Sequence, residues 1–380
     1  MSRLDELITE LCPDGVEFVT VEEICDITRG RVMSKNYLRE NTGVYPVYSS
    51  QTANNGVFGY INTFDYDCES VTWTTDGANA GSVFYHINEK FSITNVCGLL
   101  RVKNNELVST KFLFYVLQVY AKKYVNDGMG NPKLMSNVMA RISVPLPPLA
   151  VQQEIVRILD NFTELTAELT AELTARRKQY EYYRDLLLTF DDDVPRLAIS
   201  DLLIRTKGTN ITAQKMRQLH KENGEVRIFA GGKTYADVDF KDIPKKDINL
   251  NPSIIVKSRG IIEFEYYDKP FSHKNEFWSY YSENKNVNIK FVYYYLSKNV
   301  NYFQRIANNM QMPQISIPVT DKYKVPLPPI KEQERIVAIL DRFDALCNDL
   351  TSGIPAEIEA RQKQYEYYRD KLLSFKEVKA

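Results

Sequence analysis

The sequence predicts a mixed α/β protein in which two globular domains alternate with two long helices that pack as an antiparallel coiled coil. Three observations support this prediction. An internal duplication repeats at an offset of 181 residues, each copy contains a stretch with helical periodicity, and the segment before each copy is rich in short β-type runs. At 380 residues the chain is long enough for two or three domains that each bury a core.

The duplication begins at a proline-rich block. Val144-Pro-Leu-Pro-Pro148 recurs as Val325-Pro-Leu-Pro-Pro329, and the match continues into a Gln-x-x-Ile-Val-x-Ile-Leu-Asp pattern. A second block follows each copy, because Ala175–Phe190 and Ala360–Phe375 are identical at 13 of 16 positions. A match of this length indicates two equivalent halves and predicts pseudo-twofold symmetry if the helices pack antiparallel.

Both copies predict long helices. Apolar residues from Ile155 to Leu187 recur at steps of three, four or seven, which places them on one helix face. Residues 150–190 would form a helix about 60 Å long at 1.5 Å per residue. The second copy, residues 331–380, is interrupted at Ser352-Gly-Ile-Pro355, where glycine can end one helix and proline can begin the next.

The first helix contains a short tandem repeat, Thr166-Ala-Glu-Leu169 followed by Thr170-Ala-Glu-Leu173. One four-residue unit adds about 6 Å, or roughly one helical turn. Two interpretations stay open. The repeat is either an amphipathic helix made of good helix-forming residues or a spacer whose length changes by one turn per unit.

Residues 1–149 and 191–330 are predicted to form the globular domains. Runs such as Ser70–Thr74 and Ser253–Lys257, separated by Gly- and Asn-containing turns, are typical of strands. Before its proline-rich block each segment is expected to end with a helix, at Lys111–Tyr124 and Val287–Arg305.

This arrangement resembles the specificity subunit of type I restriction–modification systems. The resemblance rests on the two Leu-Pro-Pro blocks with their Gln-x-x-Ile-Val-x-Ile-Leu-Asp patterns, the Lys-Gln-Tyr-Glu-Tyr-Tyr-Arg-Asp blocks and the Thr-Ala-Glu-Leu units. It implies that residues 1–149 and 191–330 are target recognition domains, each reading one half of a split sequence in double-stranded DNA. It also implies that the helices of residues 150–190 and 331–380 set the gap between the half-sites and dock two methyltransferase and two restriction subunits.

The resemblance further implies a chain without catalytic activity or a cofactor of its own. The scattered cysteines, odd in number, are expected to be reduced thiols, which predicts a cytoplasmic location. S-adenosylmethionine, ATP and Mg²⁺ are expected on the partner subunits. No apolar run approaches the roughly 18 residues of a membrane span, the N-terminus lacks signal-peptide features, and the scattered cysteines lack CxxC spacing.

Charge neither supports nor excludes DNA binding. The formal net charge is −1, with 13 − 16 = −3 for residues 1–150 and 21 − 16 = +5 for residues 191–324. The more basic segment is therefore only modestly basic.

Two alternatives compete with a DNA reader. An autonomous enzyme is disfavoured because Asn131-Pro-Lys-Leu134 and Asn251-Pro-Ser-Ile254 lack the second proline and the aromatic residue of an adenine methyltransferase motif. Gly232-Lys-Thr234 lacks the earlier glycine of a phosphate-binding loop, and the three histidines lack metal-ligand spacing. A coiled-coil protein-interaction scaffold agrees with the helices but leaves two dissimilar globular segments unexplained.

Candidate DNA-contacting residues are cations, hydroxyls and amides in expected loops. Lysine and arginine suit phosphate, and amides have the geometry to read adenine. Taken singly, each cation is more often a solvated surface residue. The first-domain candidates, several of them in the polar turn of residues 74–79, are Arg29, Arg31, Lys35, Thr74, Thr75, Asn79 and Lys133. The second-domain candidates are Lys207, Lys233, Lys257, Ser258, Arg259, Gln311 and Gln314.

Overall fold

The computed structural model describes residues 3–307 and 313–378, and the chain separates into two compact units. The first unit comprises Met1–Thr170 and Glu357–Ala380, and the second comprises Ala171–Ala356. Each unit therefore contains one predicted globular segment together with parts of both predicted long helices. The boundaries predicted at residues 149, 190 and 330 separate globular segments from helices, whereas in the structure each globular segment packs with parts of both helices in one unit.

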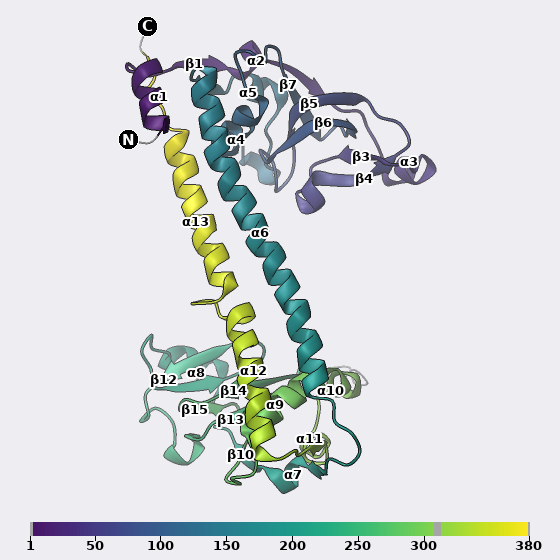
Figure 1. Ribbon diagram of the computed structural model, residues 1–380, viewed down its shortest axis with the longest axis vertical. Helices are drawn as coiled ribbons and strands as arrows, with labels where there is room; N and C mark the ends of the chain where they lie inside the picture. Colours follow the sequence, from purple (N-terminus) through teal and green to yellow (C-terminus); the bar gives the residue numbers. More distant parts are fainter. Residues whose placement is uncertain (1–2, 308–312, 379–380) are drawn as a thin grey trace. The chain divides into compact units, whose positions relative to one another are not determined.

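The globular part of the first unit is built on a mixed sheet with the strand order β2-β7-β5-β6-β3-β4, against which helix α4 packs (Figure 1). Neighbouring strands are antiparallel except β3 and β6, which are parallel. The strands are β2 (Cys25–Arg29), β3 (Tyr45–Tyr48), β4 (Val57–Ile61), β5 (Tyr66–Thr74), β6 (Val83–Ile93) and β7 (Cys97–Val102). Trp73, Leu100 and Phe112 lie in the core between the sheet and α4 (Thr110–Tyr120).

Shorter elements complete the first unit. Strand β1 pairs antiparallel with β8, which joins the start of the domain to the segment just before the first long helix. These elements are α1 (Arg3–Leu11), β1 (Glu17–Thr20), α2 (Val21–Ile24), α3 (Lys35–Glu40), η1 (Ala53–Gly56), η2 (Ala121–Tyr124), η3 (Gly128–Gly130), α5 (Ser136–Ala140) and β8 (Ser143–Leu146).

The second unit repeats this topology with the sheet divided in two. One sheet has the order β10-β16-β13-β14 and the other has the order β12-β11-β15, in which β11 and β15 are parallel, as β3 and β6 are in the first unit. β14 and β15 thus take the places of the two ends of the long strand β6. Pro270 lies between them and cannot donate a hydrogen bond to a neighbouring strand, which accounts for the break.

The strands of these two sheets are β10 (Ile204–Lys207), β11 (Val226–Phe229), β12 (Tyr235–Val238), β13 (Ser253–Lys257), β14 (Glu263–Tyr267), β15 (Phe271–His273) and β16 (Trp278–Tyr281). The second unit also contains β9 (Arg196–Ala198), α7 (Ile199–Leu202), α8 (Ala213–Leu219), η4 (Lys245–Asp247), α9 (Ile289–Lys298), α10 (Val300–Ala307), α11 (Ile317–Asp321) and β17 (Lys324–Pro326). The predicted strands at Ser70–Thr74 and Ser253–Lys257 and the predicted helices before both proline-rich blocks are confirmed.

The two long helices also agree with the prediction. The first is α6 (Leu149–Leu187), and the second is divided into α12 (Ile330–Asn348) and α13 (Ile354–Leu372) at the predicted interruption. In the break, the Asp349 carboxylate accepts hydrogen bonds from the Thr351 amide and from the hydroxyls of Thr351 and Ser352, at 2.5–2.7 Å. These bonds lower the pKa of Asp349 to about 2.

Within each unit the helices pack antiparallel. In the first unit, Phe162 of α6 stacks on Tyr368 of α13 with 5.5 Å between ring centroids, and Ile155 shares a buried cluster with Leu373. Later residues of α6 therefore meet earlier residues of the C-terminal helix. In the second unit, Tyr183 stacks on Phe343 at 5.7 Å, and Arg177 Nη2 donates to the Cys347 carbonyl at 3.4 Å, in the same antiparallel sense.

A fully buried glutamine joins each globular part to its long helix. The Gln152 amide donates to the carbonyls of Pro147 (2.7 Å) and Leu107 (2.8 Å), and its oxygen accepts from the Ser109 amide (2.8 Å). Ser109 is the N-cap residue of α4, because its hydroxyl accepts from the Phe112 amide. The glutamine therefore holds the start of α4 against the start of α6.

The second unit repeats this arrangement. The Gln333 amide donates to the carbonyls of Pro328 (2.7 Å) and Asn286 (3.0 Å), and its oxygen accepts from the amide of Asn288 (2.8 Å), the N-cap residue of α9. Further along each helix a carboxylate makes a second link. Asp160 accepts from Lys111 and Tyr115 at 2.7 and 2.6 Å. At the equivalent place Asp341 accepts from Lys290 and Tyr294 at 2.9 and 2.5 Å.

We predict that Gln152→Ala lowers the free energy of unfolding by about 1–3 kcal/mol, because it leaves a buried amide and two carbonyls without their partner. Gln333→Ala should have a similar effect. Gln153 is exposed, and Gln153→Ala should change stability by less than about 0.5 kcal/mol. Urea-induced unfolding followed by circular dichroism measures all three. Equal effects at residues 152 and 153 would contradict the anchoring role of the buried amide.

Candidate functional site

The structure brings together first-domain candidates that are far apart in the sequence. Arg29 ends β2, Thr75 follows β5, and Lys133 lies in the segment before α5. All three surround Asp76. The Thr75 hydroxyl donates to the Asp76 carboxylate at 2.6 Å, and Arg29 Nη2 and Lys133 Nζ each lie 3.9 Å from a carboxylate oxygen. Arg29 also donates to the Thr75 hydroxyl at 3.3 Å and to the Asn95 carbonyl at 2.5 Å.

Backbone hydrogen bonds hold this corner, which we call the first corner (residues 74–79 and 132–134 with Arg29). The amide of Gly77 donates to the Pro132 carbonyl at 3.0 Å, and the amide of Leu134 donates to the Thr75 carbonyl at 2.9 Å. Gly77 has a φ of 91°, which favours glycine over other residues. The Thr74 and Thr75 side chains are buried, and the Thr74 hydroxyl donates to the Asn79 carbonyl, which closes the turn.

Arg31 and Lys35 are placed outside the first corner. Arg31 forms an ion pair with Asp65 at 3.0 Å and donates to the Tyr37 hydroxyl at 3.1 Å. Lys35 is exposed at the first position of α3. The loop expected around Gly30 is thus divided between the end of a strand, a short bridge to Thr94 and a helix.

The second domain has a corner at the equivalent place (residues 258–260 and 313–315). The amide of Gly260 donates to the Pro313 carbonyl at 2.9 Å, and the amide of Ile315 donates to the Ser258 carbonyl at 3.0 Å. Arg259 and Gln314 form an antiparallel bridge, as Asp76 and Lys133 do in the first corner. Gly260 also has a positive φ, 72°. Three second-domain candidates therefore meet here, namely Ser258, Arg259 and Gln314. Lys207 ends β10, as Arg29 ends β2.

The two corners share a backbone but present different chemical groups. A hydroxyl, Thr75 or Ser258, occupies the buried position in both, and the Ser258 hydroxyl donates to the Glu276 carbonyl at 2.6 Å. At the next position the first corner has a carboxylate, Asp76, and the second has a guanidinium, Arg259. Across the bridge, Lys133 in the first corner is replaced by the amide of Gln314.

Of the remaining second-domain candidates, two are described and one is not. Lys257 is only 6% exposed, and its ammonium group contacts Glu265 at 2.7 Å, Glu263 at 3.5 Å and the Gly232 carbonyl at 3.0 Å. Among the candidate lysines and arginines, its burial makes it the least able to reach a phosphate. Lys233 is exposed in a turn between β11 and β12. Gln311 lies outside the described residues.

Asp76 is absent from the predicted contact residues, although it lies inside the polar turn that the sequence singles out. Its central place follows from the arrival of Arg29 and Lys133 beside it. Nothing in the sequence indicates that residues 29, 76 and 133 are neighbours.

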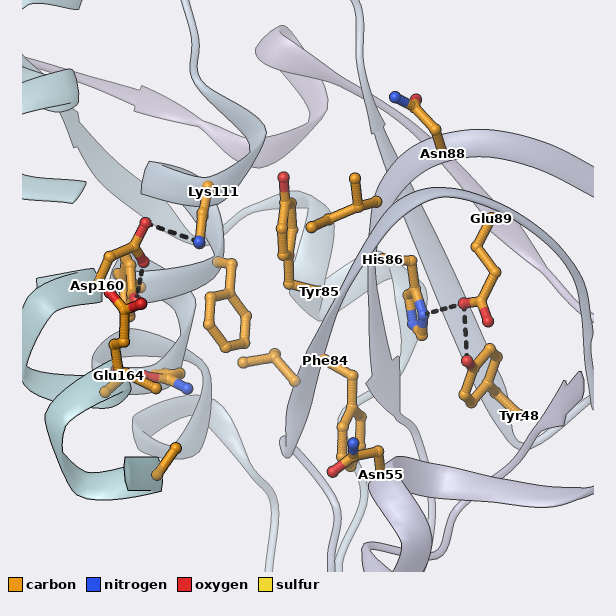
Figure 2. A pocket seen from close by; sticks show the side chains of 17 residues that line it. Tyr48, Asn55, Phe84, Tyr85, His86, Asn88, Glu89, Lys111, Asp160 and Glu164 are labelled. Carbon is orange, nitrogen blue, oxygen red and sulfur yellow. Dashed lines mark hydrogen bonds and ion pairs between the residues drawn. The ribbon is translucent and has the colours of Figure 1, made fainter. Parts of the chain in front are cut away.

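A hollow of about 1050 Å³ lies in the first unit between β6, α4 and the first part of α6 (Figure 2). On one side His86 Nδ1 lies 3.2 Å from Glu89, which also accepts from Tyr48 at 2.8 Å; on the other Lys111 contacts Asp160 (Figure 2). His86 Nε2 lies 2.8 Å from the Thr72 hydroxyl, and burial lowers the pKa of His86. The His86, Glu89 and Tyr48 side chains are therefore engaged with one another, as are Lys111 and Asp160.

The described residues also bear on the metal and membrane expectations. Over residues 3–307 and 313–378, no group of three or more His, Cys, Asp or Glu side chains is placed to hold a metal ion. In the same part of the chain, no helix has the length and apolar character that a membrane crossing needs. The five cysteines, all of them described, are free thiols.

Comparison with known proteins places two copies of one family model on the chain. The model for the type I restriction modification DNA specificity domain matches residues 13–176 and again residues 197–360. The chain is 35% identical over 372 residues to a putative type I specificity subunit from Mycoplasma pneumoniae, a match that covers 93% of this chain and 96% of that protein. A second putative specificity subunit from the same organism is 34% identical over 341 residues, covering 83% and 97%.

Solved structures show the same fold. The S subunit of a type I restriction–modification system from M. genitalium superposes with a TM-score of 0.63 at 16% identity, covering 94% of this chain and 96% of that one. A chain from a study of complex assembly and conformational transition in the type I R-M system superposes with a TM-score of 0.56 at 14% identity, covering 96% and 98%.

The buried histidine of the second unit generates a prediction about pH. His273 Nδ1 lies 3.1 Å from the Lys274 carbonyl, which can only accept, so Nδ1 carries the proton and Nε2 accepts from the Ser279 hydroxyl at 3.1 Å. Burial lowers the pKa of His273 to about 4. Because the unfolded chain binds this proton near pH 6.5, His273 should cost roughly 3 kcal/mol of stability as the pH falls from 6.5 to 4.

His273→Asn should therefore flatten the dependence of the unfolding free energy on pH over this range, whatever its effect at pH 7. Denaturant titrations at pH 7, 6, 5 and 4 measure the slope. His220 is exposed, and His220→Asn serves as the control. A slope that is unchanged in the His273 variant would show that the folded protein binds this proton.

Proposed function

The chain belongs to the family of type I restriction–modification DNA specificity subunits, and from this premise we propose that it reads a split target in double-stranded DNA without catalysing a reaction itself. Each globular domain reads one half-site. The observation that carries this proposal is the pair of equivalent corners, in which one backbone frame presents Asp76 in the first domain and Arg259 in the second. Two domains that share one backbone arrangement but carry different side chains at the same position can read two different half-sites.

The groups at the corners are those that distinguish bases. Arginine can donate two hydrogen bonds to guanine, a carboxylate can accept from the cytosine amino group, and glutamine can pair with adenine. Arg259, Asp76 and Gln314 supply these groups. The surrounding cations contact phosphates, which fixes the register and supplies affinity that depends on salt. We assign this role to Arg29, Arg31, Lys35, Lys133, Lys207 and Lys233.

The long helices serve as the spacer between the half-sites. The boundary between the two units, at Thr170 and Ala171, falls inside the Thr-Ala-Glu-Leu repeat of α6. Adding or removing a four-residue unit would change the number of helical turns between the globular domains. The helices also dock two methyltransferase and two restriction subunits, which bind S-adenosylmethionine, ATP and Mg²⁺. The assembly acts on DNA in the cytoplasm.

A coiled-coil scaffold that binds only proteins is the alternative. A scaffold that binds only proteins has no need for two corners with the same backbone, whereas a protein that reads two half-sites does. Long-read sequencing that detects methylated adenine, in cells expressing this chain with the methyltransferase subunit of its system, separates the two. Methyl-adenine in both strands of one split motif is expected. A stable complex that leaves the DNA unmethylated would favour the scaffold.

We predict that deleting Thr170–Leu173 changes the gap between the half-sites and leaves both half-sites intact, because the deletion removes about one helical turn. The methylated motif of the variant, read by the same sequencing, gives the result directly. Glu172→Gln keeps the length and should keep the gap. If the gap between the half-sites is unchanged in the deletion variant, α6 does not act as the spacer.

Asp76→Asn should strengthen binding to DNA of unrelated sequence, because it removes a negative charge that lies 3.9 Å from both Arg29 and Lys133. The plot of log affinity against log salt concentration should become steeper by about one. Asp26→Asn removes a carboxylate paired with Arg101 at 3.0 Å, at the opposite end of β2, and should leave the slope unchanged. Fluorescence anisotropy over a salt series measures both, and equal slopes would place the first corner away from DNA.

A further inference from the structure

One hairpin turn of the first domain holds the chain in an unusual conformation. This turn, residues 49–56, joins β3 to β4. Among the described non-glycine residues three have a positive φ, and two of them, Asn54 (50°) and Asn55 (52°), are consecutive here. Gly56 follows with a φ of 83°. Left-handed backbone is unfavourable for residues other than glycine, although asparagine tolerates it better than most, and such residues gather at functional sites.

The two asparagines present free amide groups on a closed turn. Both side chains are exposed, and within the described residues neither side-chain amide has a hydrogen-bond partner. The turn itself is closed from within. The Ser49 amide donates to the Gly56 carbonyl at 3.2 Å, and Gln51 Nε2 donates to the Val57 carbonyl. The fold therefore fixes the backbone of the turn and leaves its two amide side chains available to a ligand.

Hydrogen bonds connect this turn to the first corner through residues 94–96. The hydroxyls of Ser49 and Thr94 lie 2.8 Å apart. Two residues further along the chain, the Val96 carbonyl accepts from the amide of Thr75, which belongs to the corner, at 3.1 Å. The turn and the corner are therefore neighbours in the first domain.

The second domain has a hairpin turn at the equivalent place, residues 230–234 between β11 and β12. Lys257 ties this turn to the second corner. Its ammonium group donates to the Gly232 carbonyl at 3.0 Å, and the next residue in the chain is Ser258 of the corner. Lys233 is exposed within the turn. As at the corners, the arrangement recurs with different side chains, because two asparagines in one turn correspond to Gly-Gly-Lys in the other.

Stability does not account for the burial of Lys257. Its side chain is 8% exposed, whereas the side chains of its partners Glu263 and Glu265 are 48% and 37% exposed. Carboxylates in contact with water return little of the cost of removing an ammonium group from it. The contact with Gly232 explains the burial better, because it holds the carbonyl of the turn beside the corner.

We propose that the hairpin turn beside each corner contacts the same half-site as that corner. In the first domain Asn54 and Asn55 are specificity-determining residues, since a side-chain amide can make two hydrogen bonds to the edge of adenine. In the second domain Lys257 is a positioning residue that holds the turn carrying Lys233. This inference rests on the proposed function and adds a second contact element to each domain.

The shape and charge of the two turns suit DNA. Each turn is the tip of a two-stranded antiparallel ribbon at one edge of its sheet, because β4 and β12 are terminal strands. The major groove of DNA admits such a ribbon. Neither turn contains an aspartate or a glutamate, so no carboxylate within them opposes the phosphates.

The first test removes the amides and keeps the backbone. Glycine adopts a positive φ readily, so the double variant Asn54→Gly, Asn55→Gly loses both amides without added strain. Its complex with the methyltransferase subunit is titrated by fluorescence anisotropy against duplexes that carry the split motif of the unaltered chain or a single-base substitution of it. The preference for the motif base should fall about 10-fold within one half-site only, which is the scale of one bidentate contact.

Asn88→Gly is the matched control. Asn88 is the third asparagine with a positive φ, it is exposed, and it lies in β6 outside both turns. This variant should keep every base preference. Unchanged preferences in the double glycine variant would overturn the proposal. So would equal weakening on all duplexes, or the same change in the Asn88 variant.

The second test concerns the positioning role of Lys257. Lys257→Met and Lys233→Met should each lower the slope of log affinity against log salt concentration by about one, because each loses one phosphate contact. The variant with both changes should lose no more than either alone, since one lysine acts through the other. Additive losses would contradict the link. Circular dichroism verifies the fold, and the glycine variants still decide the proposal if Lys257→Met does not fold.

Failure of the proposed function would give a different result. In that case the complex of the unaltered chain would direct no methylation to a split motif, so there would be no base preference for the turns to alter. A split motif that is methylated, with preferences that the turn variants leave unchanged, would overturn this inference alone.

Discussion

At the start of each long helix, one buried glutamine side chain satisfies three backbone groups from two other segments. Gln152 and Gln333 each accept a hydrogen bond from the backbone amide of an N-cap residue and donate to two backbone carbonyls. Both side chains are inaccessible to solvent. A buried polar group that loses its partners costs more than a hydrogen bond contributes, so the arrangement admits one geometry. The position of each sheet relative to its own long helix depends on this link. The carboxylates of Asp160 and Asp341 reinforce it further along the helix.

That link leaves the rest of each globular part free to diverge. In the second unit the long strand β6 is replaced by β14 and β15, yet the parallel pairing of β11 with β15 repeats that of β3 with β6. The corners follow the same principle. Their backbone hydrogen bonds are equivalent, from Gly77 to Pro132 and from Gly260 to Pro313, while the side chains differ. Backbone geometry is retained because many side chains are compatible with it, which allows a reading surface to change without loss of the fold.

The corners also show how far a candidate site can be predicted. Arg29, Thr75 and Lys133 are selected from the sequence as separate loop residues, and the structure places them around Asp76. Ser258, Arg259 and Gln314 converge in the same way. Lys257, at the end of the predicted strand Ser253–Lys257, is selected from the sequence as a DNA-contact candidate, and the structure buries it against Glu263 and Glu265. A lysine at the end of a strand can face either side of the sheet, and only its neighbours decide which side is covered.

By itself, the sequence determined the duplication, the extent of the long helices, the presence of a break in the second one and the order of domain and helix. The break was predicted at residues 352–355 and lies at residues 349–353. These features depend on local information, since helical hydrogen bonds join residues four apart and identity between copies is read directly. The tertiary structure alone decided how the strands pair, which residues meet at each corner, and that each compact unit combines one globular part with portions of both long helices. These contacts join residues up to hundreds of positions apart, and their energies come from packing and buried hydrogen bonds that no local pattern records.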